Sequence, residues 1–278
     1  MSKKTDLSIL EPFLRVESFE WGDVVRFGDD VLAMADAANA LEHFRYLLED
    51  LQHYEGRPLV LWGTDRSFSP QRCNALLRDW GNLCEGHAGG RSFPSPLLKF
   101  AMTREENFFG GLIRWLRSVK RPVIKVFQGD VSLSFLGIGL ACDYRIATSE
   151  TTFYNQGLDF DMPPGSGLLY LLPAYLGLGR ANTLVTRIPE ITAQSACAWG
   201  LLDEVVLPAE LGPAVQRMAT ESSCLSAGTR DTIKQLFNHH LPSLETYFEL
   251  EAHGIEMALH AKPWERLPDE ETEDAARK

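Results

Sequence analysis

Several features of secreted and membrane proteins are absent from this sequence of 278 residues. Its five cysteines are odd in number and none stand in a Cys-x-x-Cys spacing, which argues against a disulfide framework and a cysteine-based zinc site. No apolar run reaches the roughly 18 residues that a transmembrane helix needs, and no apolar signal segment follows Met1. We therefore expect a cytoplasmic protein that does not associate with membranes.

Positive charge is also scarce, because 27 lysines and arginines stand against 38 aspartates and glutamates, for a net charge of −11. Nucleic-acid binding needs a basic surface, so we expect no nucleic-acid partner. The neighbouring His239 and His240 are not accompanied by spaced carboxylates or cysteines, and we expect no metal site. A small phosphate-bearing ligand remains compatible with this charge, because a local basic patch is enough to hold it.

The pattern of apolar residues indicates an α/β protein. Rough alternation from 13 to 27 predicts an early β-hairpin, and apolar runs at 58–62 and 122–127 predict buried strands. Helical spacing predicts a helix over 33–53. Strand, turn and helix units of this kind are typical of an α/β core.

The same pattern suggests how the chain is divided. From residue 209 onward it becomes almost wholly helical, which predicts a core at 1–208 and a C-terminal helical subdomain at 209–268. The last segment, 269–278, is strongly charged, and we expect it to be disordered.

Six ordered blocks between residues 120 and 208 are the most specific signal. They are RPVIKVFQG at 121–129, the uninterrupted segment from there to Cys142-Asp143, YRIATSE at 144–150 followed by Thr152-Phe153, MPPGSG at 162–167, LPAYLGLGRA at 172–181, and ITAQSACAWGLLD at 191–203 followed by Val205-Val206. In order and spacing these blocks resemble the crotonase superfamily, the enoyl-CoA hydratase/isomerase family. The strand ending at Gly63, with Ser67-Phe-Ser69 after it, resembles the family more loosely.

This resemblance implies a fold, an assembly and a ligand. The fold is a spiral of ββα turns, and the C-terminal helices form an oligomerisation subdomain in a homotrimer or homohexamer. The ligand is an acyl thioester, of coenzyme A or of an acyl carrier protein, so we expect no cofactor apart from coenzyme A as part of the substrate. Arg26, Arg45 and Lys262 are candidates for contacts with the phosphates of coenzyme A.

The family holds the thioester carbonyl with two backbone N–H groups, whose positions carry over to Arg72 and Ser134. Such amides stabilise the negative charge of an enolate or tetrahedral oxyanion, and removing one donor costs about 3 kcal/mol. Every residue except proline supplies a backbone amide, so losing the family's glycine run at 133–135 keeps the donor but crowds the acyl pocket. The side chain of Arg72 either meets a carboxylate or phosphate of the ligand or lies solvated at a helix start.

The two catalytic glutamates of the family fall on glycines in this chain, Gly137 and Gly157. Hydration of an enoyl thioester needs one carboxylate to deprotonate water and an acid to protonate Cα, and glycine does neither. Asp159 and Asp161 could substitute if their segment is extended, because positions 157, 159 and 161 then share one face. Alternatively, both aspartates end the turn that precedes Met162.

A further substitute is His253, in the segment ELEAH at 249–253. This segment resembles the tail of the hydratase-like decarboxylases of polyketide β-branching, a crotonase subgroup that lacks both glutamates and in which a histidine of this region is assigned to the active site. A single histidine on a helix can equally be structural or exposed. Cys73 has no histidine near it in sequence, and we interpret it as a buried apolar cysteine.

Three functions remain open at this point. The first is an enzyme with non-standard acid/base groups that isomerises or decarboxylates an acyl thioester through an enolate stabilised by the two amides. The second is a non-catalytic acyl-CoA-binding or scaffold homologue, which the two glycines also favour. The third, a conventional enoyl-CoA hydratase, is disfavoured because both glutamates are missing.

Overall fold

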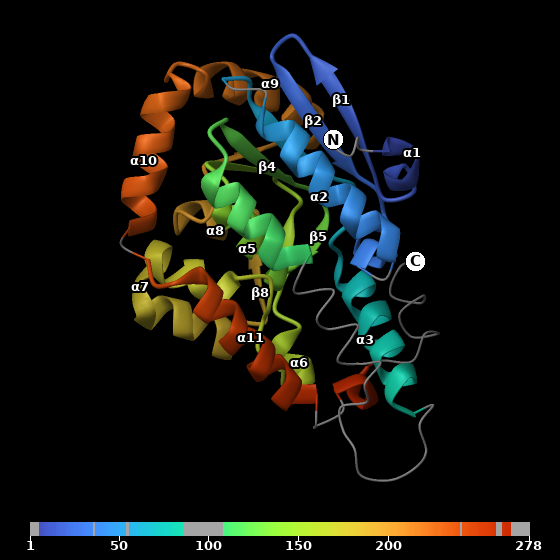
Figure 1. Ribbon diagram of the computed structural model, residues 1–278. Helices are drawn as coiled ribbons and strands as arrows, with labels where there is room; N and C mark the ends of the chain where they lie inside the picture. Colours follow the sequence, from blue (N-terminus) through green and yellow to red (C-terminus); the bar gives the residue numbers. More distant parts are fainter. Residues whose placement is uncertain are drawn as a thin grey trace.

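A six-stranded sheet organises the upper part of the molecule in the computed structural model, which describes residues 6–35, 37–53, 56–85, 108–239, 241–259 and 263–267 (Figure 1). In spatial order its strands are β1 (Leu14–Phe19), β2 (Gly22–Phe27), β3 (Leu59–Gly63), β4 (Val123–Phe127), β6 (Tyr144–Thr148) and β9 (Glu204–Val206). β1 and β2 form the antiparallel hairpin expected from the sequence, and the other neighbouring pairs are parallel. Parallel neighbours need crossover connections, and in this fold they contain the helices.

A second, three-stranded sheet begins where the chain leaves β4. Its strands, in spatial order, are β5 (Asp130–Ser132), β7 (Thr152–Tyr154) and β8 (Glu190–Thr192). The bend between β4 and β5 lies at Gly129, whose φ is +65°, and a Cβ there would come within 2.7 Å of the Asp65 side chain. Glycine is therefore needed for both conformation and space, and the bend directs the chain toward the candidate site.

Helices cover both faces of the main sheet. Their bounds are α1 (Leu7–Leu10), η1 (Val31–Ala35), α2 (Ala38–Gln52), α3 (Pro70–Glu85), η2 (Leu133–Phe135), α5 (Leu136–Ala141), α6 (Gly157–Phe160), α7 (Leu168–Arg187), α8 (Ala193–Ala198), η3 (Pro208–Glu210), α9 (Leu211–Ser222), α10 (Ala227–His239), α11 (Leu244–Leu259) and η4 (Pro263–Arg266). Residues 108–118 are also helical. No helix in these described ranges is both long and apolar enough to cross a membrane.

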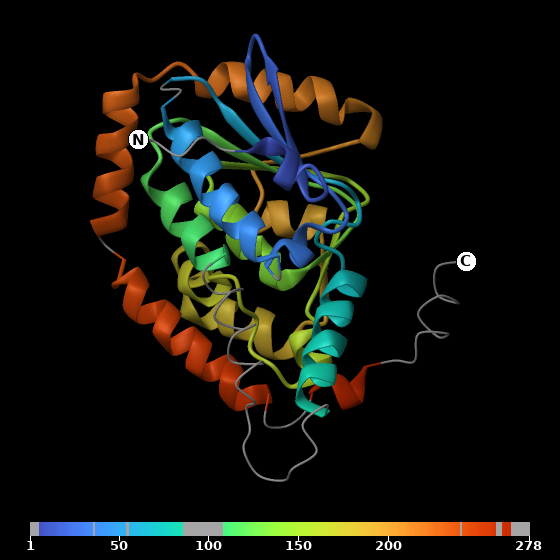
Figure 2. The same cartoon turned by 45° about the vertical axis from the view of Figure 1, so that its right-hand side comes forward.

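The two faces of the sheet have different cores, because successive residues of a strand point to opposite faces. Leu59 and Leu61 of β3 belong to the large core that includes residues of α2, α5 and the helix at 108–118. Val60, between them, belongs to a smaller core with Leu211 and Val215 of α9. Figure 2 shows α9 crossing the top of the molecule, with α2 and α5 on the other side of the sheet.

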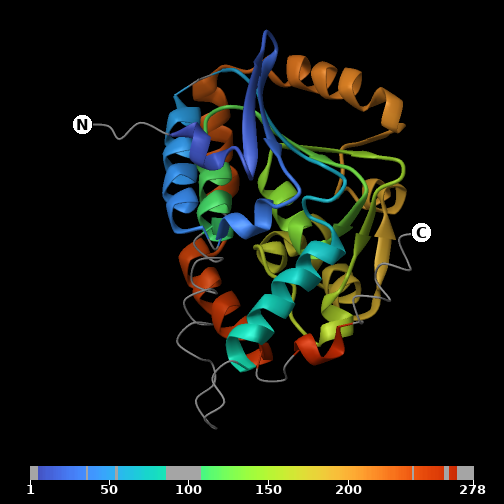
Figure 3. The ribbon, with the colours of Figure 1, turned by 90° about the vertical axis from the view of Figure 1, so that its right-hand side faces the viewer.

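The C-terminal helices wrap around one side of the molecule. α10 descends along the edge and α11 continues below it, near α7 (Figures 1 and 3). Lys234 of α10 pairs with Asp143 at 3.0 Å, and Tyr170 of α7 stacks near Tyr247 of α11 with ring centroids 5.1 Å apart. These contacts fasten the helices to the core. The division at 208/209 remains a prediction, and the expected disordered tail at 269–278 lies outside the described residues.

The α/β class expected from the sequence is confirmed, and the condition under which Asp159 and Asp161 would share a strand face with position 157 is not met. Residues 157–160 form the short helix α6, and the amide of Met162 closes it by donating to the Gly157 carbonyl at 3.0 Å. Burial of Phe160 holds this turn against the core. Asp161 then takes the left-handed conformation, with φ of 57°, so positions 157, 159 and 161 do not share a strand face.

Candidate active site

A small cavity of about 100 Å³ lies where α3, η2, α6 and α11 meet, and we call it the central cavity. Most of its wall is apolar and includes Leu76, Leu77, Trp80, Phe135, Phe160 and Ile255. The polar side chains on its wall are Cys73, Ser132, Ser134, Gln156 and Ser166. Among the described residues, no carboxylate, histidine or lysine lines it. Such a lining suits an apolar group with one polar end.

Ser134, one of the two expected amide donors, lies on the cavity wall. It is the second residue of η2, which runs directly into α5, and the first amides of a helix have no acceptor within that helix. The bond from the Ser132 amide to the Phe68 carbonyl, 2.9 Å long, joins the start of η2 to the Ser-Phe-Ser segment. The amide of Ser134 is therefore among the first of this helix start, and its role as an oxyanion donor stays a prediction.

Arg72, the other expected donor, lies in the first turn of α3 and is not part of the cavity wall. Its amide donates to the Ser69 carbonyl at 3.1 Å, and its guanidinium pairs with Asp30 at 2.8 Å. The next residue, Cys73, does line the cavity, although we had interpreted it as a buried apolar cysteine. The structure thus places both Ser134 and Cys73 on the cavity wall and leaves the amide of Arg72 bound to the carbonyl of Ser69, the residue before α3.

Backbone atoms close Gly137 and Gly157, the two positions to which the resemblance carries the glutamates of the family. A Cβ at Gly137 would lie 2.3 Å from the Ser166 carbonyl oxygen and 2.7 Å from the Leu168 nitrogen, because α5 packs against the start of α7. A Cβ at Gly157, which lines the cavity, would lie 2.5 Å from the Met162 carbonyl oxygen. Real Cβ atoms do not approach backbone atoms this closely, so neither position has room for any side chain in this conformation.

None of the three substitute proton-transfer groups lines the central cavity. Asp159 is exposed on α6, and Asp161 is exposed and lies 3.6 Å from Arg266. His253 is exposed on α11, whereas Ile255 of the same helix reaches the cavity. The structure therefore places these three side chains around the site and not inside it.

Two polar clusters near the cavity were missed by sequence reasoning. Gln156 donates to the Pro70 carbonyl at 3.0 Å and to Asn74 Oδ1 at 2.6 Å, which joins the cavity wall to the first turns of α3. Glu251 of α11 accepts from the Gly167 amide at 3.1 Å and from the Tyr247 hydroxyl at 2.5 Å. Gln156 and Asn74 are 82 residues apart in the sequence, and Gly167 and Glu251 are 84 residues apart. No local sequence pattern marks such pairs, because their members meet only when the chain folds.

Glu251 also affects a neighbouring tyrosine. Burial raises the pKa of the Tyr247 phenol above its usual range, and the charge of the adjacent Glu251 carboxylate raises it further. Tyr247 therefore stays protonated and keeps donating to Glu251. This pair holds α11 against Gly167, the residue before α7.

Lys125 of β4 is buried behind the cavity. Its ammonium lies over three aromatic rings, with the Phe68 centroid at 4.5 Å, Phe127 at 5.0 Å and Phe27 at 5.6 Å. Its Nζ has no hydrogen-bond partner among the described residues, and burial lowers the pKa of this amine to about 8. Phe68 in turn packs against Phe135 of the cavity wall, with ring centroids 5.0 Å apart.

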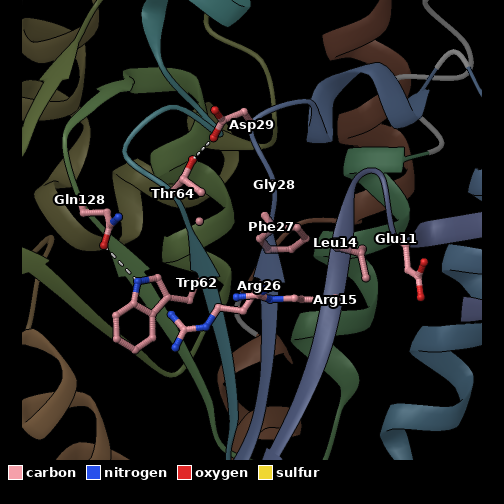
Figure 4. Close-up of a pocket in the computed structure, with 11 residues that line it drawn as sticks. Glu11, Leu14, Arg15, Arg26, Phe27, Gly28, Asp29, Trp62, Thr64 and Gln128 are labelled. Carbon is pink, nitrogen blue, oxygen red and sulfur yellow. Dashed lines mark hydrogen bonds between the residues drawn. The ribbon is translucent and has the colours of Figure 1, made fainter. Parts of the chain in front are cut away.

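A second cavity, of about 510 Å³, lies at the end of the main sheet, and Figure 4 shows the residues that line it. We call it the sheet-edge cavity and define it by Leu14, Arg15, Arg26, Asp29, Trp62 and Gln128, with Glu11 and the backbone around Gly28 and Gly63. Arg26 was one of three candidates for phosphate contacts. Of the others, Arg45 lies over the Tyr46 ring at 5.5 Å, and Lys262 lies outside the described residues. No group of side chains suited to hold a metal ion is found in the described part of the chain.

Comparisons to known proteins agree with the fold. The sequence matches the family model described as enoyl-CoA hydratase/isomerase over residues 99–264, more than half of the chain, and the protein therefore belongs to the enoyl-CoA hydratase/isomerase family. This confirms the resemblance carried by the six sequence blocks. The match concerns the family and not the reaction.

Individual relatives are distant. The chain is 32% identical over 119 residues to the crotonyl-CoA hydratase of Syntrophomonas wolfei, a match that covers 41% of this chain and 46% of that protein. It is 27% identical over 159 residues to the 1,2-epoxyphenylacetyl-CoA isomerase of Escherichia coli K12, covering 57% and 60%. The chain thus spans about half the length of the curated relatives it matches.

Solved structures support the fold. The enoyl-CoA hydratase of Bacillus halodurans superposes with a TM-score of 0.72 at 16% sequence identity, covering 92% of this chain and 100% of that chain. A polyketide biosynthesis enoyl-CoA hydratase of Bacillus subtilis gives 0.69 at 16% identity, covering 91% and 94%. At these identities the likeness concerns the fold alone.

Proposed function

We propose that the protein binds an acyl thioester with its acyl group in the central cavity and promotes a reaction through an enolate, of the decarboxylase or isomerase type. Decarboxylation is the reaction that the cavity supports best. The observation behind this choice is that Ser134 lies on a wall on which, among the described residues, no carboxylate, histidine or lysine is present. Hydration by the family's pair of glutamates is disfavoured, because backbone atoms fill both positions.

Decarboxylation of a malonyl-type thioester fits such a wall because it requires no base. The bond between Cα and the carboxylate breaks, carbon dioxide leaves, and the electron pair moves onto the thioester oxygen as an enolate. Amide donors stabilise that oxygen, with about 3 kcal/mol lost per donor removed. An apolar wall also destabilises the ionised carboxylate before it leaves, since burying an unpaired charge is unfavourable. Water then supplies the proton that Cα takes up.

Isomerisation remains within the proposal but also needs a catalytic base. A double bond moves only if a base removes a proton and returns it to another carbon. Asp159, Asp161 and His253 are the nearby groups proposed for this step, and one of them would have to turn into the cavity. Support comes from relatives named as isomerases, the 1,2-epoxyphenylacetyl-CoA isomerase of Escherichia coli and the trans-2-decenoyl-[acyl-carrier-protein] isomerase of Streptococcus mutans. The choice between coenzyme A and a carrier protein stays open.

A second candidate function is a non-catalytic acyl-thioester-binding or scaffold protein. The bond between the Arg72 amide and the Ser69 carbonyl favours it, because one of the two expected oxyanion donors is then engaged. Its cavity would still accept an apolar acyl group. The two candidates therefore share a ligand and differ in turnover.

We also propose that the protein assembles as a homotrimer or homohexamer through its C-terminal helices. Large apolar side chains are exposed on α7, α10 and α11, namely Leu178, Leu236, Phe237, Leu250 and Met257. Burial of such residues at a subunit contact is favourable. Light scattering coupled to size-exclusion chromatography measures the mass, and a monomer at micromolar concentration would contradict this assembly. We further propose that the protein acts in the cytoplasm.

A panel of purified thioesters tests the proposed reaction. Malonyl-, methylmalonyl-, 3-enoyl- and 2-enoyl-thioesters of coenzyme A and of a carrier protein are incubated with the protein, and products are identified by mass spectrometry. We expect loss of carbon dioxide from a malonyl-type substrate and little hydration of crotonyl-CoA. Binding without turnover of any substrate would favour the non-catalytic function, and efficient hydration would overturn the proposal.

A matched pair of variants tests the amide. Ser134→Ala keeps the backbone N–H and removes only the hydroxyl, whereas Ser134→Pro removes the N–H at a position where a helix start tolerates proline. We expect roughly a 100-fold loss of kcat for the proline variant, from a donor worth about 3 kcal/mol, and a small change for alanine. Equal activity of both variants would contradict a role for this amide, provided that circular dichroism shows both to be folded.

A further inference from the structure

We propose that Lys125 stabilises the enolate formed in the central cavity by placing a buried positive charge behind the cavity wall. This role rests on the function proposed above, because it requires an acyl thioester to be bound with its acyl group in that cavity. Lys125 does not line the cavity. It therefore acts on the ligand through its charge and not through contact.

A single aromatic ring separates Lys125 from the cavity wall. The Lys125 ammonium lies 4.5 Å from the centre of the Phe68 ring, and the Phe68 ring packs against Phe135 with centroids 5.0 Å apart. Phe135 lines the cavity and directly follows Ser134, whose amide is the expected donor to the enolate oxygen. The Phe68 carbonyl also accepts from the Ser132 amide at 2.9 Å, which holds this segment against the start of η2. The ammonium is thus fixed a short distance behind the wall that contains Ser134.

The charge of Lys125 has no partner that offsets it. The residue is 1% exposed, and its Nζ has no hydrogen-bond partner within the described part of the chain. The neighbouring group that acts on its charge is the Cys142 thiol, and burial raises the pKa of this thiol to about 12, so it stays neutral at pH 7. Burial lowers the pKa of the Lys125 amine to about 8, which still leaves it mostly protonated at pH 7.

The other charged groups near Lys125 are already paired with one another. Arg145 of β6 is the register partner of Lys125, and its guanidinium lies 2.8 Å from the Asp203 carboxylate. Asp143, the residue after Cys142, pairs with Lys234 of α10 at 3.0 Å. The charge of Lys125 is therefore left to act on an anion that forms in the cavity.

Coulomb's law gives the size of the effect. Two opposite unit charges about 10 Å apart, at an effective dielectric constant of about 20, attract each other by an amount equivalent to roughly a tenfold change in an equilibrium constant. The two ring contacts place the ammonium within that distance of the Phe135 ring. An unpartnered buried charge destabilises a fold, and such a group beside a ligand cavity is a candidate for function.

Acetoacetyl-CoA is a suitable probe of this charge. Its acyl group is neutral as the ketone and negative as the enolate, and the enolate has its own ultraviolet absorption band. A malonyl-type thioester is negative before and after it loses carbon dioxide, so it would not isolate the effect. Spectrophotometric titration of the bound probe gives the pH at which half of it is enolate. We expect this pH to be about one unit higher for Lys125→Met than for the wild-type protein, which corresponds to a tenfold change.

Two further variants serve as controls. Lys120→Met removes the same charge from a lysine just before β4 whose side chain is 50% exposed and lies 3.6 Å from Asp231. Lys125→Arg keeps a positive charge behind the wall. We expect both to titrate like the wild-type protein. Circular dichroism checks that all variants fold, and calorimetry checks that they bind the probe.

The outcomes separate this role from the proposed function. If the probe binds to all variants and its half-enolate pH is the same in Lys125→Met as in the wild type, the role of Lys125 is overturned and the binding function stands. The role is also overturned if Lys120→Met or Lys125→Arg shifts that pH as much as Lys125→Met. If the wild-type protein binds neither acetoacetyl-CoA nor any other acyl thioester, the proposed function fails and the role of Lys125 fails with it.

Discussion

The central cavity and the sheet-edge cavity differ in volume, about 100 against about 510 Å³, and in what forms their walls. At the first, the Gly157 backbone on the wall and the Gly137 backbone near it lie close to other backbone atoms, which leaves no room for a side chain at either position. At the second, long charged side chains surround open space. Substitutions should therefore act through packing at the central cavity and through charge at the sheet-edge cavity.

The largest effect is expected at Gly137. In the Gly137→Ala variant the new methyl group would lie 2.3 Å from the Ser166 carbonyl oxygen, and backbone on both sides prevents relief. We expect a loss of about 3 kcal/mol or more in the free energy of unfolding, measured by denaturant titration. Gly179→Ala is the control, because a Cβ there meets nothing within 4 Å and should change stability by less than about 1 kcal/mol. Equal stability of the two variants would show that α5 and α7 are not packed this tightly.

A substitution at Lys125, behind the central cavity, should raise the stability of the protein, whereas the substitution at Gly137 should lower it. Lys125→Met removes a buried, unpartnered charge and should raise the free energy of unfolding at pH 7 by roughly 2–3 kcal/mol. The folded-state pKa of about 8 is below the ordinary 10.5, so between these values the unfolded chain binds more protons and the wild-type protein gains stability as pH rises. The advantage of the variant should therefore shrink between pH 8 and 10.5, as measured by chemical denaturation at several pH values. A constant advantage would contradict a titrating Lys125.

A smaller effect is expected at Gly157. Gly157→Ala places a Cβ 2.5 Å from the Met162 carbonyl oxygen, which belongs to a short turn that can shift more easily than a helix. We expect a loss of about 2 kcal/mol, together with weaker acyl-thioester binding because the turn forms the cavity wall. Thermal denaturation and calorimetry measure the two quantities, with Gly212→Ala as the control at an open position. If Gly157→Ala weakens binding without lowering stability, Gly157 is needed for the shape of the cavity wall and not for the stability of the fold.

The smallest effect is expected at Asp161. Its pair with Arg266 is exposed, and such pairs contribute about 0–1 kcal/mol, so Asp161→Asn should unfold at nearly the wild-type temperature. The proposed decarboxylation needs no base, so turnover of a malonyl-type thioester should also be unchanged. If Asp161→Asn or Asp159→Asn removes the activity while the protein stays folded, an isomerase-type proton shuttle is the better description.

The sequence predicted more of the core than of the site. The strands at Val123–Phe127 and Tyr144–Thr148 could be predicted because apolar runs and turn residues are local signals. The segment after Asn155 could not, because its residues left both an extended conformation and a turn before Met162 open. Closure of a helical turn and burial of Phe160 decided the conformation instead.

By itself, the sequence determined the family and the α/β class, and it places glycine at positions 137 and 157 and a backbone amide at Ser134, since each depends on residue identity and order along the chain. Only the tertiary structure decided that Gly137 and Gly157 are closed by backbone, and that Gln156 meets Asn74. It also decided that Lys125 lies among aromatic rings and that Arg15 and Arg26 share Glu17. These features depend on distances between segments far apart in sequence, which arise only when the core packs.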